Sequence, residues 1–205
     1  MDIILDKLCK TYGTHTILKD FSARIPEGKV TAVMAPSGKG KTTLLRILMG
    51  LETPDSGTIS GLSGLKMSAV FQEDRLCENL SPVSNIRLVA PFLKKTEIIA
   101  AMECVGLSDC FYQPVRKLSG GMKRRTAILR ALLAEYDVLF LDEPFKGLDT
   151  ETRRLVIEDT RERSKGKTVI LITHEPEDAS AMEACQILAI QEVPEKFCYR
   201  RESGK

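Results

Sequence analysis

A glycine-rich segment at residues 35–43 (APSGKGKTT) is the feature that most constrains how this chain folds. The preceding residues 30–34 are typical of a buried strand, and apolar residues recur at helical spacing from 40 to 49. A loop between a strand and a helix N-terminus directs several backbone N–H groups toward one point, where they bind anions. The segment therefore predicts a phosphate site, with Lys41 charged against the phosphates and the Thr42 hydroxyl on Mg²⁺.

The rest of the chain alternates between strand-like and helix-like segments. We expect strands at 2–8, 17–25, 30–34, 66–71, 138–141 and 168–172, and turns at 26–28 and 53–57. We expect helices at 40–49, 119–134 and 150–165, a helical stretch at 82–115, a helix beginning near Pro176, and edge strands from Gln186. This order predicts an α/β fold without a dividing linker, in which the β-rich start and the helical middle are additions to the core sheet.

Composition narrows the class of protein. The 205 residues are 43% hydrophobic and 28% charged, as in ordinary globular domains. A net charge of +2 gives no electrostatic reason to expect nucleic acid as a partner. No run of about 18 apolar residues is present, so we expect no membrane-spanning segment. The six cysteines are scattered, which favours reduced thiols over a metal site: Cys9, Cys77, Cys104, Cys110, Cys185 and Cys198.

Further polar residues follow predicted strands. Residues 138–144 (VLFLDEP) end an apolar strand in Asp142 and Glu143, and His174 follows the strand at 168–172. Alone, an acidic pair or a single histidine at a strand end can also be structural. Because ligands bind beyond the carboxyl ends of parallel strands, we expect Lys41, Asp142, Glu143 and His174 at one edge of the sheet. Asp142 suits a Mg²⁺ site there, and Glu143 suits a general base that polarises water.

Residues 118–122 (LSGGM) predict a second anion site. Ser119 is a favourable N-cap, and Gly120 and Gly121 leave the first amides of the following helix accessible. The alternative is a plain N-cap with a flexible glycine pair. The chain offers no second glycine-rich phosphate loop for this site, so a second copy of the protein would supply the nucleotide.

Taken together, these segments resemble the ATPase domain of an ABC transporter over residues 3–190. The resemblance rests on several motifs in one order: Tyr12-Gly13, the glycine-rich loop at 35–43, Gln72 in VFQE, LSGGM, Asp142-Glu143, Gly147-Leu148-Asp149, and His174. It implies a single ABC-type ATPase domain over 1–205, with a P-loop NTPase core sheet. An antiparallel β subdomain and an inserted α-helical subdomain at about 73–134 would complete the fold.

The resemblance also implies a role for each matching residue. Catalysis would fall to Glu143, His174, Gln72 and Lys41, and Mg²⁺ would be held by Thr42, Gln72 and Asp142. Tyr12 would stack on adenine, and Asp149 would cross a dimer interface. ATP would be bound by a larger set, part of it from each copy of a head-to-tail dimer: Tyr12, Ala35, Pro36, Ser37, Gly38, Lys39, Gly40, Lys41, Thr42, Thr43, Ser119, Gly120, Gly121 and Asp149.

By the same resemblance, the chain is expected to hydrolyse ATP and so energise a membrane transporter, with import as the favoured direction. Its partners would be transmembrane permease subunits, an identical or closely related ATPase, and an extracytoplasmic substrate-binding protein. It would lie in the cytoplasm, on the inner face of the membrane. Two alternatives remain open: a nucleotide-sensing regulatory module with weak hydrolysis, and an ABC ATPase that does not serve transport. The cargo is not specified.

Three positions depart from the usual pattern of this family. Ala35 replaces a glycine, Met122 replaces a glutamine after the signature glycines, and Lys146-Gly147 replaces Ser-Ala. We expect these changes to affect the rate of hydrolysis more than ATP binding. Residues 70–76 (VFQEDRL) also resemble the nitrate, sulfonate and taurine importer subfamily.

Overall fold

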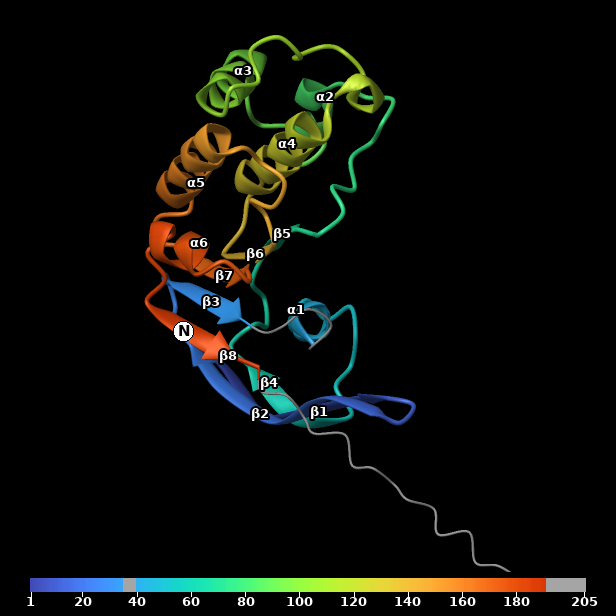
Figure 1. The fold of residues 1–205 in the computed structure, drawn as a ribbon, viewed down its shortest axis with the longest axis vertical. Coiled ribbons are helices and arrows are strands. Elements are labelled where there is room, and N and C mark those ends of the chain that lie inside the picture. The colour runs from blue at the N-terminus through green and yellow to red at the C-terminus, as the bar shows by residue number, and fades with distance from the viewer. Residues whose placement is uncertain (35–39, 191–205) are drawn as a thin grey trace, which may run out of the picture.

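The structure is a computed structural model that describes residues 1–34 and 40–190. Its centre is a five-stranded parallel sheet (Figure 1) in the order β5 (Met67–Val70), β6 (Val138–Asp142), β7 (Thr168–Ile172), β3 (Val30–Met34) and β8 (Gln186–Ala189). Strands β6 and β7 are buried at every position. This explains their continuous apolar sequences, because both faces of a central parallel strand are covered.

Alternate residues of these strands belong to two different cores. On β6, Leu139 and Leu141 pack with the helices, whereas Val138 and Phe140 pack toward α1 (Lys41–Leu48) and the second sheet. That sheet is antiparallel, in the order β2 (His15–Ile25), β1 (Ile3–Tyr12) and β4 (Ser56–Ser60). Helix α1 therefore lies between the two sheets and contributes apolar side chains to the core between them.

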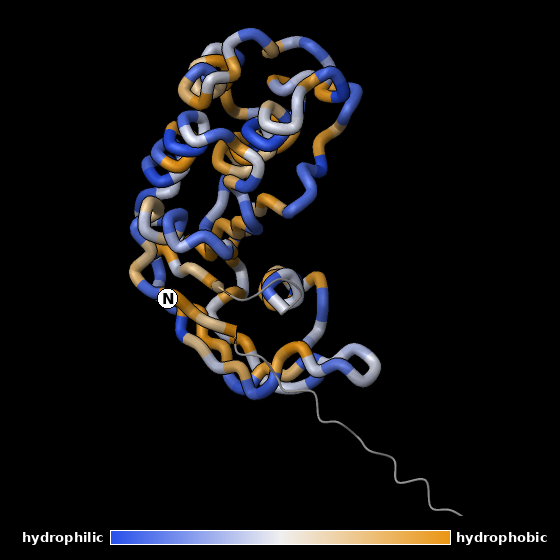
Figure 2. Tube along the Cα trace, in the orientation of Figure 1, coloured by the Kyte–Doolittle hydropathy of each residue, from blue (hydrophilic) through white to orange (hydrophobic). Residues whose placement is uncertain are grey.

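The remaining helical elements are α2 (Pro82–Arg87), α3 (Lys95–Cys104), the 3₁₀ turn η1 (Val115–Lys117), α4 (Gly120–Leu132), α5 (Thr150–Arg163) and α6 (Pro176–Ala181). Among them, α4 contacts β5 of the parallel sheet, while α2 and α3 pack against α4. Figure 1 shows α2, α3 and α4 gathered at one end of the molecule and the antiparallel sheet at the other. Apolar residues line the strands, while much of α5 is hydrophilic (Figure 2). In the described ranges, no helix combines the length and apolarity needed to cross a bilayer.

The predicted α/β fold, with its core sheet, antiparallel β part and helical part, is confirmed. The five described cysteines, which exclude Cys198, are free. Two local predictions were wrong. The stretch 82–115 is not one helical run but two short helices joined by a loop. The turn at 53–57 already includes the start of β4 at Ser56, because Ser56 pairs with Cys9 of β1 despite the turn-like composition.

Candidate functional site

Three strands of the parallel sheet end at the same level. Val33 of β3 and Asp142 of β6 both pair with Ile172 of β7, so the residues that follow these strands meet at one edge. Glu143 comes directly after β6, and its N–H donates to the Ile172 carbonyl at 2.9 Å. His174 follows β7 by two residues. The edge predicted from strand ends is therefore present.

Asp142 and Thr42 form one corner of this edge. The Thr42 hydroxyl lies 3.4 Å from Asp142 Oδ2, and the Asp142 side chain is buried. Burial, followed by the charge of Glu143, raises the pKa of Asp142, while nearby Lys41 acts in the opposite direction. A buried carboxylate and a neighbouring hydroxyl supply hard oxygen ligands, and a bound cation would stabilise the buried negative charge. The residues present therefore fit Mg²⁺.

Glu143 is held from two sides. Its Oε1 lies 3.2 Å from His174 Nδ1, and its Oε2 lies 3.1 Å from Lys146 Nζ in an ion pair without a well-aligned hydrogen bond. Burial alone would raise the pKa of Glu143, but Lys146 and then His174 outweigh it, so the pKa is lowered. The other ring nitrogen of His174 lies 3.1 Å from Glu175.

The backbone of Glu143 is also unusual. Its φ of 45° lies in the left-handed region, which costs a residue with a Cβ about 1–2 kcal/mol. Such conformations persist only where surrounding contacts impose them. The strained residue is thus the one that the sequence predicts as the general base.

A cavity of about 350 Å³ lies beside Glu143. It is lined by residues from the end of β5, from the start of α4 and from the turn after β6: Gln72, Asp74, Gly120, Gly121, Arg124, Glu143, Lys146 and Gly147. We call residues 71–74 the Gln72 loop, residues 142–146 the Glu143 turn and residues 119–121 the α4 tip. These three segments, distant in sequence, border a single space.

Two helix starts carry the remaining predicted polar residues. Ser119 is the N-cap of α4, and its hydroxyl accepts from the Met122 N–H at 3.3 Å. Gly120 is exposed and its surroundings are open. Asp149 is the N-cap of α5 and accepts from the Thr152 N–H at 3.0 Å, a contact that lowers the pKa of Asp149. Figure 1 shows α4 and α1 in separate parts of the molecule.

Tyr12 lies at the end of the β1–β2 hairpin and leans toward α1. Its hydroxyl donates to the Glu52 carboxylate and is also close to Thr43. Burial and then Glu52 raise the pKa of Tyr12. Lys10 Nζ lies 5.4 Å from the ring centroid and 3.4 Å from Glu52. The ring is thus fixed beside the start of α1, and 44% of Tyr12 is exposed.

Part of the predicted nucleotide site lies outside the described residues: Ala35, Pro36, Ser37, Gly38 and Lys39. Gly40, the N-cap of α1, is described and has a φ of 88°. A Cβ at Gly40 would lie 2.7 Å from Ile17 Cγ2, so both its conformation and its packing require glycine.

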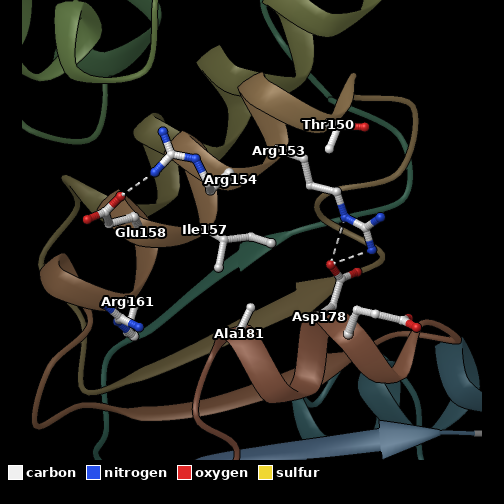
Figure 3. A pocket seen from close by; sticks show the side chains of 9 residues that line it. Thr150, Arg153, Arg154, Ile157, Glu158, Arg161, Asp178 and Ala181 are labelled. Carbon is white, nitrogen blue, oxygen red and sulfur yellow. Dashed lines mark hydrogen bonds and ion pairs between the residues drawn. The ribbon is translucent and has the colours of Figure 1, made fainter.

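A groove of about 400 Å³ lies away from this edge, between α5 and α6 (Figure 3). Across it, Arg153 donates to Asp178 at 2.7 and 2.9 Å, and Asp178 in turn accepts from the Thr173 hydroxyl at 3.1 Å. These contacts fix the residue that precedes His174. The contacts across the groove therefore support the site, and none of the predicted site residues lines the groove.

Sequence reasoning missed two residues that shape the site. Arg124 resembles an ordinary surface charge on a basic helix, yet it is buried against the Glu143 turn. Glu52 lies forty residues from its partner Tyr12, and no local pattern connects them. Lys146 was noticed as a departure, but its ion pair with Glu143 depends on the shape of the turn and could not be inferred.

Comparison with known proteins identifies the family. The model of the ABC transporter family matches residues 18–146. The chain belongs to this family. This family membership agrees with the resemblance that the sequence motifs indicate.

Three relatives show the range of proteins similar to this ABC ATPase. The Fe(3+) ions import ATP-binding protein FbpC of Agrobacterium fabrum is 37% identical over 88% of the chain and 56% of its own length. The aliphatic sulfonates import ATP-binding protein SsuB 2 of Pseudomonas fluorescens is 36% identical over 91% and 72%. The Nod factor export ATP-binding protein I of Cupriavidus pinatubonensis is 32% identical over 91% and 62%. The chain thus spans little more than half of some relatives.

A solved structure agrees with the fold. The dimeric bacterial ABC transporter cassette MJ0796 is 27% identical and superposes with a TM-score of 0.79, covering 92% of this chain and 94% of its own. The sulfonate relative accords with the subfamily resemblance of residues 70–76. The iron relative is equally similar, however, so similarity alone selects no cargo for this ABC ATPase.

Proposed function

We propose that this chain binds Mg-ATP between two copies in head-to-tail arrangement and hydrolyses it to energise a membrane transporter. The observation that carries the proposal is the meeting of Thr42, Asp142, Glu143 and His174 at one sheet edge, while the α4 tip belongs to a different part of the molecule.

The nucleotide would be held by the start of α1. Lys41 is buried near Asp142, where its charge suits the β and γ phosphates. Tyr12, fixed by Glu52 beside Thr43, is placed to stack on adenine. Residues 35–40 would complete the phosphate cradle. Thr42 and Asp142, joined by Gln72, would hold Mg²⁺, which neutralises phosphate charge when bound.

Hydrolysis would depend on Glu143. Its lowered pKa keeps the carboxylate ionised, so it can accept a proton from the water that attacks the γ-phosphorus. The bond from the γ-phosphorus to the bridging oxygen then breaks, and ADP and phosphate leave. His174, 3.2 Å from Glu143, would hold the γ-phosphate and orient the carboxylate. Gln72 would sense the same water from across the cavity.

The second copy would complete each site. The tip of the thirteen-residue helix α4 presents the Ser119 hydroxyl and the first amides of the helix, including that of Gly120. An anion is favoured there, and the γ-phosphate bound by the opposite copy would supply it. Asp149, exposed at the start of α5, would contact the opposite copy.

A membrane permease is the proposed partner for the helical part. Four large apolar side chains are exposed there, at the end of α2 and in the following loops: Leu88, Val89, Phe92 and Tyr112. Exposed apolar side chains of this size are available to contact another protein. We propose docking on the cytoplasmic face of the membrane, in an importer supplied by an extracytoplasmic substrate-binding protein. Copurification with an export permease instead would contradict the direction of transport.

The decisive experiment is Glu143→Gln. We expect steady-state Mg-ATP hydrolysis to fall by about 10²–10⁴-fold, because the general base is lost while the side-chain shape is kept. Mg-ATP should still bind, and it should convert the variant to a stable dimer, as measured by size-exclusion chromatography.

The matched control is Glu158→Gln on α5, where Glu158 forms an exposed ion pair with Arg154. This control should hydrolyse ATP at the wild-type rate. Unchanged hydrolysis in Glu143→Gln, or the absence of Mg-ATP binding in the wild type, would contradict the proposed function.

A second function, a nucleotide sensor with weak hydrolysis, is favoured by one specific contact. Lys146 binds the carboxylate that must act on water, which disfavours fast turnover. Phosphate release by the purified chain, with and without its permease, separates the two functions. A sensor would remain slow in both conditions.

A further inference from the structure

Arg124 on α4 is nine-tenths buried and contacts two segments of the candidate site. Its guanidinium donates to three successive carbonyls of the Glu143 turn: those of Asp142 at 2.9 Å, Glu143 at 2.7 Å and Pro144 at 2.8 Å. Arginine suits this position, because its planar fork directs several N–H donors at fixed angles.

The same side chain also reaches the Gln72 loop. Arg124 Nη1 donates to the carbonyls of Phe71 at 2.6 Å and Gln72 at 3.4 Å, and to Asp74 Oδ1 at 3.2 Å. One buried cation therefore joins the α4 tip, on whose helix it lies, to both loops that border the cavity beside Glu143.

The bonds to the Glu143 turn explain how its backbone is held. Glu143 has a left-handed φ of 45°, and its own carbonyl and those on either side all accept from Arg124. Without these donors, each of the three carbonyls would lose its bond from Arg124, and that of Glu143 would keep only the Lys146 N–H at 3.3 Å. Lys146 and His174 would still contact the Glu143 carboxylate, and the bond from its N–H to the Ile172 carbonyl would still hold its backbone on one side.

We propose that Arg124 is a positioning residue for hydrolysis, which locks the Glu143 turn to the Gln72 loop and to the helix that carries the α4 tip. Through Arg124, the general base, the Gln72 loop and the tip offered to the second copy move as one unit. This inference rests on the proposed function, because it adds a residue to the same reaction.

Two other arginines of α4 show that this arrangement is specific. Arg125 donates to the carbonyls of Gly121, Val105 and Gly106, all within the helical part. Arg130 donates to the carbonyls of Asp74 at 3.1 Å and Arg75 at 2.7 Å, and neither of these bonds involves the Glu143 turn. Arg130 is therefore a matched control that touches one segment where Arg124 touches two.

The test compares Arg124→Lys with Arg130→Lys. Lysine keeps the charge but loses the fork. We expect single-turnover Mg-ATP hydrolysis to fall by about 10- to 100-fold in Arg124→Lys, the usual loss when a residue that orients a catalytic group is removed. The Kd for Mg-ATP should stay within about threefold, because Arg124 contacts neither Lys41 nor Thr42. Arg130→Lys should hydrolyse at nearly the wild-type rate.

Hydrogen exchange in the nucleotide-free protein provides a second readout. In Arg124→Lys, amides of residues 71–75 and of residues 142–146 should both exchange faster, whereas Arg130→Lys should affect only 71–75. This measurement is independent of turnover. A wild type that fails to hydrolyse ATP would contradict the proposed function, while the exchange pattern would still decide whether Arg124 joins the two segments.

A double variant shows whether Arg124 acts through Glu143. In a Glu143→Gln background, Arg124→Lys should cause no further loss of residual hydrolysis. Additive losses would overturn the proposal, as would a parallel loss of ATP affinity or faster exchange in only one segment. Arg124→Gln serves if the lysine variant does not fold. Failure of both to fold, with Arg130→Lys intact, would also overturn the proposal, because Arg124 would then be structural.

Discussion

At the scale of single residues, the charges around Glu143 define the site. Its two carboxylate oxygens face different side chains, Lys146 at 3.1 Å and His174 at 3.2 Å. Of these, Lys146 contributes more to the lowered pKa of Glu143. A carboxylate held in this way is ionised at low pH but is a weak base, since basicity falls with pKa. Lys146 therefore makes Glu143 a weaker base but keeps its carboxylate ionised over a wider pH range.

Replacing Lys146 should reverse both effects on Glu143. In Lys146→Ala, the main cause of the lowered pKa is lost, so the pKa of Glu143 rises and a higher pH is needed to ionise it. The acidic limb of the kcat profile should therefore move to higher pH. Turnover on the alkaline plateau should increase, because the freed carboxylate is the stronger base. Steady-state kinetics between pH 5 and 9 would measure both effects.

Lys165→Ala is the control for this prediction, because Lys165 is exposed at the end of α5. It removes one positive charge and should leave the profile unchanged. An acidic limb that stays in place in Lys146→Ala, or moves to lower pH, would show that the ion pair does not govern Glu143.

At the scale of elements, the antiparallel sheet depends on a close approach of two backbones. Gly61, just after β4, has a φ of 89°, and a Cβ there would lie 2.3 Å from the Asp2 carbonyl oxygen. Gly64, in the next turn, has a similar φ of 78° with nothing within 4 Å. The two glycines share the backbone requirement but differ in available space.

This difference predicts that alanine at the two positions lowers the free energy of unfolding by unequal amounts. Gly64→Ala should lower the free energy of unfolding by about 1–2 kcal/mol, the strain of a left-handed residue with a Cβ. Gly61→Ala should cost a further 1–3 kcal/mol or so, because a backbone atom must move. Thermal unfolding should show the order, at about 2–4 °C per kcal/mol for a chain of this size. Equal melting temperatures would refute the close approach.

The sequence was most informative where local chemistry determines structure. The helix starts at Gly40, Ser119 and Asp149, and the apolar strands that end at Asp142 and Ile172, were predictable from residue type and spacing. The strand β4 was not, because its pairing with β1 outweighs a turn-like composition. Arg124 and Glu52 were missed because their contacts exist only after distant segments pack together.

At the scale of the whole molecule, a symmetric pair of copies would contain two sites, each built from both chains. One copy would supply Lys41 and the other the α4 tip. Mixing experiments distinguish this arrangement from a site within one chain. When two variants carry defects in different halves of the site, a mixed pair places both defects in one of its two sites and leaves the other site intact.

The prediction uses two variants that should be inactive alone. Lys41→Ala removes the positive charge that would face the phosphates. Gly120→Glu places a carboxylate at the α4 tip, where Gly120 has open space around it. In an equal mixture, half of the pairs combine both variants, and each such pair contains one intact site. Mg-ATP hydrolysis should recover to about a quarter of the wild-type rate.

The separate variants, each at the total concentration of the mixture, are the controls. If each chain used its own α4 tip, no pair would contain an intact site, and the mixture would stay as inactive as its components. That result would contradict the shared site.

The position of β3 in the sheet has a consequence for biosynthesis. Both neighbours of β3 come from much later in the chain, β7 at residues 168–172 and β8 at 186–189. During translation, β3 therefore remains unpaired until more than four-fifths of these 205 residues have been synthesised. Such long-range parallel pairing is slow and leaves apolar edges open to aggregation. Chaperone demand during synthesis should therefore peak just before β8 emerges.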